Sequence, residues 1–161
     1  MNEKDIIFLE QLLSNKDKDY VVSQLKTIDN PLLLHYFAAN YNWDSGFDIP
    51  TAILENEACD LGTGLLMFHY ADGYCLLENL NEISSSSIDE WNVFLIKIYY
   101  RILSLDFKSQ DICFDSELTK IQKYKLKKNN PNLPDILISK SPGKEIDIPY
   151  ARMISVRGFP N

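Results

Sequence analysis

Residues 30–40 read NPLLLHYFAAN, and they open the segment that decides the fold. Asn30 can cap a helix with its side-chain oxygen, and Pro31 suits the first helical position because no backbone N–H is needed there. The apolar run that follows predicts a helix that ends near Asn40. Pro50 also precedes an apolar triplet, so a second helix is expected to begin there.

Apolar residues recur at helical spacing on both sides of this segment. Toward the N-terminus, residues 6–13 and 21–28 predict two short helices, the first of them capped by Asn2. Toward the C-terminus, one helix is expected to begin at Pro50, and the next is capped by Asp60 and runs to Asp72. A further helix is opened by a capping box of Ser87 and Glu90 and runs to Leu105. The last is capped by Asp115 and runs through Leu126.

The fold class that follows is mainly α, with about seven short packed helices. Helical hairpins and a solenoid-like array both fit this pattern. Beyond Asn129 prolines interrupt the chain, and residues 136–138, 146–148 and 153–156 are expected to form short strands or extended arms in an irregular tail. The length of 161 residues suits a single helical domain over residues 1–161.

Charge is distributed unevenly along the chain. Residues 1–115, the acidic body, hold 19 Asp and Glu against 7 Lys and Arg, a net charge of −12. Residues 116–161, the basic tail, hold 4 against 9, a net charge of +5. An acidic body disfavours nucleic acid as a partner and favours a cationic protein, although a general solubilising role for these charges remains an alternative.

The N-terminus has neither the basic start nor the uninterrupted apolar core of a signal peptide. No apolar run approaches the length that spans a bilayer, so we expect a cytoplasmic protein without a membrane partner. Cys59, Cys75 and Cys113 are widely spaced and odd in number, which suits neither a disulfide framework nor a metal motif. They are predicted to be reduced and mostly buried.

Candidate catalytic residues are few. His35 and His69 lie within apolar helix faces, and no metal-ligand spacing or nucleophile motif accompanies them. We therefore expect structural histidines, no metal, no cofactor and no enzymatic activity. The alternative is a metal-dependent hydrolase that combines these histidines with nearby aspartates. Residues 62–64 read GTG, which favours close helix packing over a lone anion site.

Aromatic and acidic residues gather between residues 41 and 60, around a loop that reads NWDSGFD. Trp and Tyr provide large rigid contact areas in protein interfaces, and carboxylates select a cationic partner. The alternative is that Trp43 and Phe47 fill the core beneath a turn that Asp44, Asp48 and Asp60 cap.

Three motifs in this part of the chain carry a family resemblance. Residues 42–50 contain N-W-D-x-G-F-x-x-P, residues 59–65 contain C-D-L-G-T-x-L, and residues 71–73 read A-D-G. Together they resemble the core of an uncharacterised bacterial domain family, over roughly residues 30–80. That family has no established enzymatic activity. Small acidic bacterial proteins of this kind are often found beside secreted polymorphic toxins, which implies a toxin-immunity type of protein.

The resulting hypothesis is an immunity protein that binds and neutralises a polymorphic or contact-dependent toxin. The cognate toxin domain would be a cationic nuclease whose active site is blocked, as in contact-dependent growth inhibition. A helical interaction module with another partner is the main alternative, and the oligomeric state is left open. The expected partner-binding residues are Tyr41, Trp43, Asp44, Asp48, Glu55, Glu57, Asp60 and Asp72, with Glu78, Glu82, Asp89 and Glu90 as further acids that could hold the toxin.

Overall fold

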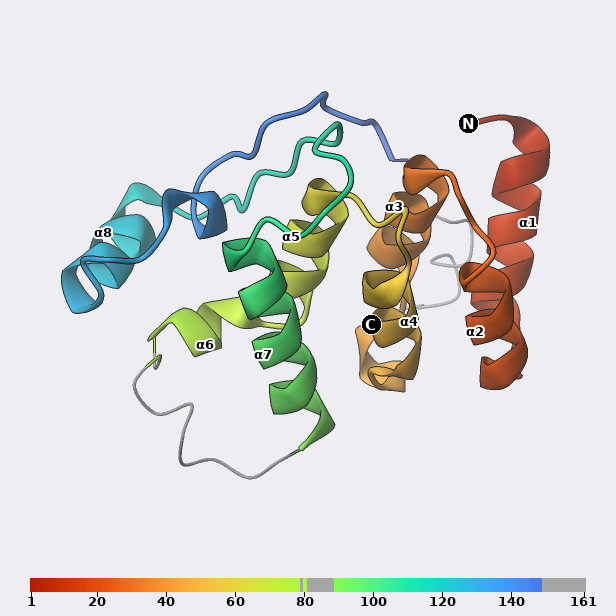
Figure 1. Ribbon diagram of the computed structural model, residues 1–161, viewed down its shortest axis with the longest axis horizontal. Helices are drawn as coiled ribbons and strands as arrows, with labels where there is room; N and C mark the ends of the chain where they lie inside the picture. The colour runs from red at the N-terminus through yellow and green to blue at the C-terminus, as the bar shows by residue number, and fades with distance from the viewer. Residues whose placement is uncertain (79, 81–88, 149–161) are drawn as a thin grey trace, which may run out of the picture.

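The computed structural model describes residues 1–78, 80 and 89–148, and within them the protein is mainly α-helical (Figure 1). Strand-like pairing in these residues is limited to one isolated parallel bridge between Ile112 and Lys144. The helices are α1 (Glu3–Ser14), α2 (Lys18–Leu25), α3 (Pro31–Asn40), α4 (Asp48–Glu55), α5 (Leu61–Tyr70), α6 (Gly73–Glu78), α7 (Glu90–Leu103) and α8 (Lys120–Asn129), with short 3-10 helices η1 (Trp43–Ser45) and η3 (Asp135–Leu137).

Helices two apart in the sequence pack side by side. Helix α1 contacts α3, α3 contacts α5, and α5 contacts α7, while α2 contacts α4 beside them. Most of these strong contacts join helices two apart in the sequence, while α3 with α4 and α5 with α6 are the sequence neighbours that also pack together. The described residues hold eight α-helices rather than about seven, because the segment expected to run from Leu61 to Asp72 ends at Tyr70 and α6 begins separately at Gly73. Asp72 has a φ of 63°, which breaks the helix.

Side-chain caps fix several helix starts as the sequence predicts. The Asn2 side chain accepts from the Asp5 backbone N–H, and the Asp5 carboxylate accepts from the Asn2 N–H in return. The Asn30 side chain accepts from the Leu32 N–H at 3.0 Å, and Pro31 occupies the first turn. The predicted start and end of α3 are therefore confirmed, as is the start of α5 at Leu61.

Three predicted helix starts are wrong. Helix α7 is capped by Asp89, which accepts from the Asn92 N–H at 2.8 Å, while Ser87 lies outside the described residues. Helix α8 is capped by Thr119 rather than Asp115, because Glu117 has a φ of 53° and the intervening chain cannot be helical. Helix α4 begins at Asp48, two residues before Pro50. Proline is tolerated in the first turn of a helix because the N–H groups of that turn have no partner within the helix.

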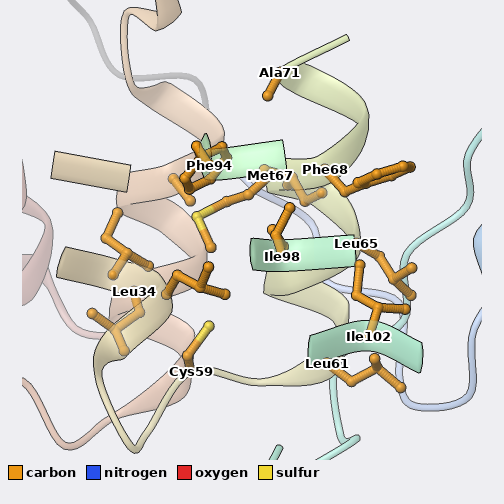
Figure 2. Close-up of a cluster of buried hydrophobic side chains, with 14 of the residues drawn as sticks. Leu34, Cys59, Leu61, Leu65, Met67, Phe68, Ala71, Phe94, Ile98 and Ile102 are labelled. Carbon is orange, nitrogen blue, oxygen red and sulfur yellow. The ribbon is translucent and has the colours of Figure 1, made fainter. Parts of the chain in front are cut away.

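Helix α5 lies at the centre of the hydrophobic core (Figure 2). Its residues 61–68 are all buried, so this helix contacts neighbours on every side. Leu34 of α3 and Phe94, Ile98 and Ile102 of α7 belong to the same core cluster, and α5 packs against both of these helices. The buried apolar side chains form one cluster from α1 to η3.

Glycine allows a loop to cross the start of α5 closely. A Cβ atom on Gly62 would lie 2.1 Å from the Ile112 carbonyl oxygen, and one on Gly64 would lie 2.6 Å from the Phe107 ring. Both distances are far below van der Waals contact. At Gly62 the neighbour is backbone, so only glycine fits there, whereas a Cβ at position 64 would require the Phe107 ring to move. The close packing that the sequence predicts for residues 62–64 is what the structure shows.

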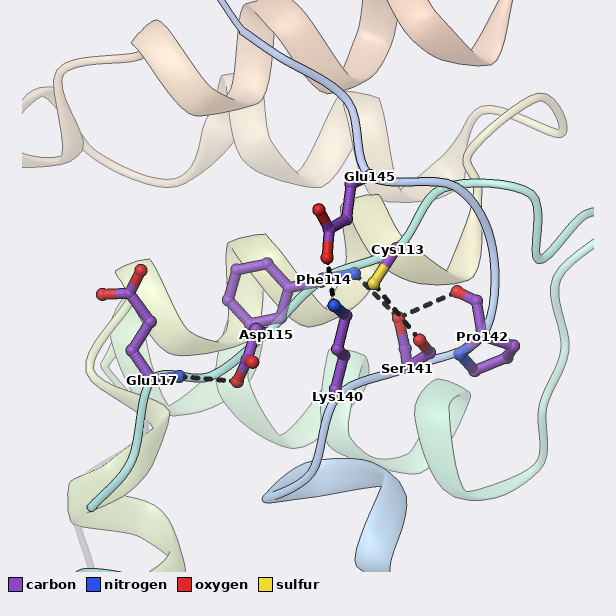
Figure 3. Close-up of polar contacts among 8 residues, drawn as sticks. All are labelled: Cys113, Phe114, Asp115, Glu117, Lys140, Ser141, Pro142 and Glu145. Carbon is purple, nitrogen blue, oxygen red and sulfur yellow. Dashed lines mark hydrogen bonds and ion pairs between the residues drawn. The ribbon is translucent and has the colours of Figure 1, made fainter.

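The described part of the basic tail folds back onto the body. Residues 139–145 run beside residues 111–117, and the Cys113 N–H donates to the Lys144 carbonyl at 2.9 Å. Figure 3 shows the neighbouring bond, in which the Phe114 N–H donates to the Ser141 hydroxyl at 2.8 Å. Leu126, Leu133 and Leu137 belong to the core cluster.

Two of the three tail segments that were expected to form short strands or extended arms are described, and neither forms a strand. Residues 135–137 form η3, and residues 146–148 have no regular structure, while residues 153–156 lie outside the described part. In the described part of the tail, β-bridge pairing is limited to the one bridge between Lys144 and Ile112. Within the described residues, no helix combines the length and the apolar character needed to cross a membrane.

Candidate partner-binding surface

Contacts between aromatic rings hold the loop of residues 41–48 in place. Trp43 packs edge-on against Tyr41 at a centroid distance of 5.7 Å, and its ring also meets Tyr70 and Phe94. The Tyr41 hydroxyl donates to the Gly46 carbonyl at 2.9 Å, which closes the loop. Burial, and then the negative charge of Asp48, raises the pKa of Tyr41 to about 12. Tyr41 and Trp43 therefore position the loop from beneath.

Carboxylates from α2, α4 and the segments that follow these two helices line a groove. Between α2 and α4 lies a hollow of about 330 Å³, and it continues into a second one of about 730 Å³ that also borders the segments after α2 and α4. The two share Lys26 and Glu55, and we call them together the α4 groove. Its charged lining consists of five carboxylates and three ammonium groups, Asp19, Asp29, Asp48, Glu55 and Glu57 against Lys18, Lys26 and Lys108.

Three of the predicted binding residues thus share the groove, and each pairs with a lysine of the chain. Asp48 lies 4.0 Å from Lys18, Glu55 pairs with Lys97 of α7, and Glu57 pairs with Lys108. The Lys108 hydrogen bond lowers the pKa of Glu57. All six side chains are substantially exposed, so these pairs are screened by water and contribute little to stability. A cation from a partner could replace such a lysine at small cost.

An apolar stripe on α7 adjoins the groove. Helix α7 buries Phe94, Leu95, Ile98 and Ile102, yet its opposite side is apolar too. That side carries Val93, Ile96, Tyr100 and Leu103, which recur at steps of three and four residues; we call these four the α7 stripe. Tyr100 is 62% exposed and Val93 is 51% exposed. Lys97 lies at the edge of the stripe and reaches Glu55, so it joins the two features.

Sequence reasoning missed the stripe and two groove carboxylates, Asp19 and Asp29. A signal for the stripe was present, because residues 90–103 read EWNVFLIKIYYRIL and carry more apolar residues than one buried face needs. Asp19 and Asp29 gave no such signal, since isolated acidic residues at helix ends are ordinary surface features.

Asp60 is wrongly placed among the contact residues. Its carboxylate is fully buried and accepts four hydrogen bonds, from the Gly62, Asp111 and Ile112 N–H groups and from the Ser109 hydroxyl. A buried carboxylate must be satisfied internally, and here it caps α5 while holding residues 109–112 in place. Asp60 does not cap the turn of residues 42–48 either; its predicted role as the cap of the helix that starts at Leu61 is confirmed.

The other predicted acids lie apart from the groove. Asp44 is exposed on η1. The next residue, Ser45, is the one that contacts the groove, because its carbonyl accepts a hydrogen bond from the Lys18 ammonium group. Asp72 and Glu78 flank α6, which contacts α5 and α8 rather than α4. Glu82 lies outside the described residues, and Asp89 and Glu90 begin α7. The structure therefore gathers Asp48, Glu55 and Glu57 and separates the remainder.

Both histidines are held by internal hydrogen bonds. His35 Nδ1 lies 3.0 Å from the Thr63 hydroxyl, and burial lowers the pKa of His35 to about 4 against a smaller opposing effect of Asp60. His69 Nε2 lies 2.9 Å from the Leu137 carbonyl, and burial lowers its pKa as well. These contacts give each imidazole a structural role. In the described part of the chain, no three His, Cys, Asp or Glu side chains cluster as metal ligands would.

Residues 29–103 match a family described as a domain of unknown function, DUF4274. The match covers a little under half of the chain, so it is a similarity of that part. It extends beyond residue 80, where the motif resemblance stops, and takes in α7. The structure gives the reason, because α7 packs on α5 and the Trp91 indole donates to the Ala71 carbonyl at 2.8 Å. No curated protein and no solved structure matches the chain significantly.

Proposed function

We propose that the protein is an immunity protein that binds a cationic bacterial toxin domain and neutralises it. The observation that carries this proposal is the α4 groove, in which five carboxylates from three separate segments border two hollows that share Glu55. A nuclease that contacts phosphates has a basic active site, and carboxylates at phosphate-like positions would occupy it.

The α7 stripe supports a protein partner rather than a small cation. Stable interfaces combine an apolar centre with a polar rim, and aromatic residues are enriched at such centres. Tyr100 and its apolar neighbours would form the centre, and Glu55 and Glu57 would form the rim. A complex of ordinary size buries about 1,200–2,000 Å² in total. Groove and stripe together offer a mixed surface of the required kind.

Electrostatic steering would assist the encounter. The acidic body carries a net charge of −12, and a field of this sign accelerates association with a cationic partner at low ionic strength. The lysines of the groove do not prevent binding, because their ion pairs are exposed and easily exchanged.

Co-expression with the toxin domain encoded beside the protein tests the proposal. We expect the protein to restore growth of bacteria that produce the toxin domain, and the two chains to elute together as a complex after purification. Absence of both growth rescue and complex would overturn the immunity function. A complex with a different protein and no rescue would favour the alternative of a general helical interaction module.

A further inference from the structure

Helix α8 carries an exposed face that the described residues leave uncovered. Leu126 is the one side chain of α8 that is buried. With successive residues 100° apart, the side opposite Leu126 presents Lys120, Tyr124 and Lys128 along one line and Ile121 and Lys125 along the next. We call these five residues the α8 face. Ile121 is 69% exposed and Tyr124 is 67% exposed, so two large apolar side chains lie in water between three lysines.

Helix α8 carries no acidic residue that could pair with the lysines of the α8 face. Residues 120–129 contain five lysines and no acidic residue. Lys127, which is not part of the face, pairs with Asp135 at 2.8 Å and donates to the Leu133 carbonyl. Lysines near a helix C-terminus are favoured by the helix dipole, but that effect does not account for the exposed Ile121 and Tyr124 beside them.

The feature of the chain that complements this face lies elsewhere in the molecule. The α4 groove has an excess of carboxylates and a hollow that could receive side chains. Figure 1 shows α8 at one end of the long axis and α2, which forms one wall of the groove, toward the other. The face and the groove therefore cannot meet within one chain.

We propose that the α8 face docks into the α4 groove of a second copy of this chain. Lys120, Lys125 and Lys128 would meet groove carboxylates such as Asp29 and Glu57, while Tyr124 and Ile121 would enter the hollow. The acidic body and the basic tail have opposite net charges, which orients the two copies for this contact. The inference does not rest on the proposed immunity function, because it requires only the charges and shape of one chain.

The contact is expected to be weak and sensitive to salt. Each copy has a net charge of −7, so general repulsion opposes the local attraction. Salt screens charge pairs at the surface, since the Debye length falls from about 10 Å at 0.1 M to about 3 Å at 1 M. A cationic partner of the proposed kind would compete with the second copy for the groove.

Sedimentation equilibrium of the purified full chain tests the proposal. In dilute buffer we expect the apparent mass to rise above 18.6 kDa with protein concentration, and to return to that value in roughly 0.5 M NaCl. Reversing the face with Lys120→Glu, Lys125→Glu and Lys128→Glu should abolish association, as should reversing the groove with Asp29→Lys and Glu57→Lys. A mixture of these two variants should associate, because each reversed surface then meets an opposite charge.

A matched control separates this contact from bulk charge. Lys4→Glu, Lys16→Glu and Lys144→Glu change the net charge as the face variant does, but these exposed lysines lie outside α8 and the groove lining. The control should still associate, and circular dichroism should show native helix content in every variant. A monomer at all concentrations, an associating face variant, a non-associating control or a mixture that stays monomeric would each overturn the proposal.

Discussion

The Ser109 hydroxyl donates a 2.6 Å hydrogen bond to the carboxylate of Asp60, a residue 49 positions earlier in the chain. The same carboxylate accepts from the Gly62 N–H at the start of α5 and from two N–H groups of residues 111 and 112. One buried side chain thus caps a central helix and attaches the loop that crosses it. The glycines at positions 62 and 64 make room for that loop.

Replacing Asp60 is expected to destabilise the fold. In an Asp60→Ala variant, four donors lose their acceptor, two of them on the buried residues Gly62 and Ile112, and the free energy of unfolding should fall by about 3 kcal/mol or more. Asp60→Asn should cost less, because its side-chain oxygen can still accept. Urea denaturation followed by circular dichroism measures both. Asp106→Ala, a change of an exposed aspartate in the same region, should stay within about 0.5 kcal/mol of the parent.

We expect Trp43 to stabilise the fold through the packing of its ring and not through a hydrogen bond of its N–H group. The Nε1 atom is buried, and no described residue accepts its hydrogen bond. Trp43→Phe removes an unsatisfied donor while keeping an aromatic ring against Phe94, so we expect a change of less than about 1 kcal/mol. Trp43→Ala should cost about 3–5 kcal/mol. Equal losses in the two variants, measured by urea denaturation, would show that the N–H group has a partner.

Stability should depend on pH through His35. Its pKa of about 4 in the folded protein lies below the ordinary value of 6.5. The neutral ring therefore stabilises the fold above pH 6.5, and this contribution is lost as the pH falls toward 4. Between pH 7 and pH 5, the lowered pKa of His35 is expected to reduce the free energy of unfolding by about 2 kcal/mol.

A His35→Gln variant checks this pH dependence. Glutamine does not titrate and can still bond to Thr63, so the variant should lose less stability than the parent between pH 7 and pH 5. The difference between the two proteins isolates His35 from the carboxylates, which titrate in both. His69→Gln is a useful comparison, because burial also lowers the pKa of His69. If parent and His35→Gln respond alike, His35 is not buried as a neutral ring.

Toxin binding, if the proposed function holds, should fail when the groove or the stripe is altered. Asp29→Lys with Glu57→Lys should weaken binding at least about 100-fold, because the change places positive charge against a cationic partner. Tyr100→Asp should have an effect of similar size by removing an apolar anchor. Both sites are exposed, so the fold should be retained. Isothermal titration calorimetry with the toxin domain provides the measurement.

The matched control for the groove is Asp72→Lys with Glu78→Lys. These two acids were also predicted to bind the partner, but they lie beside α6, away from the groove. The same change in net charge should leave the affinity nearly unchanged apart from a small effect on association rate. If the α6 variant loses binding and the groove variant keeps it, the partner contacts the surface around α6.

Local signals in the sequence were sufficient for the helices whose caps lie next to them. Asn2, Asn30 and Asp60 each satisfy N–H groups two or three residues away, so short-range chemistry decides those starts. The prediction failed at α8 because Glu117 adopts a left-handed conformation, which Asp115 offers no sign of. In the tail, residues 136–138 were expected to be a strand or an extended arm, but residues 135–137 form the 3-10 helix η3.

The sequence by itself determined the helical class, several helix starts and the opposite charges of body and tail, because periodicity, capping and charge depend on residue type and near neighbours. Only the tertiary structure decided which carboxylates reach a partner. Asp60 and Glu57 lie three residues apart, yet one is buried by a loop from residues 109–112 and the other faces the groove. Burial depends on segments distant in the chain, and so does the meeting of Glu55 with Lys97 at the edge of the α7 stripe.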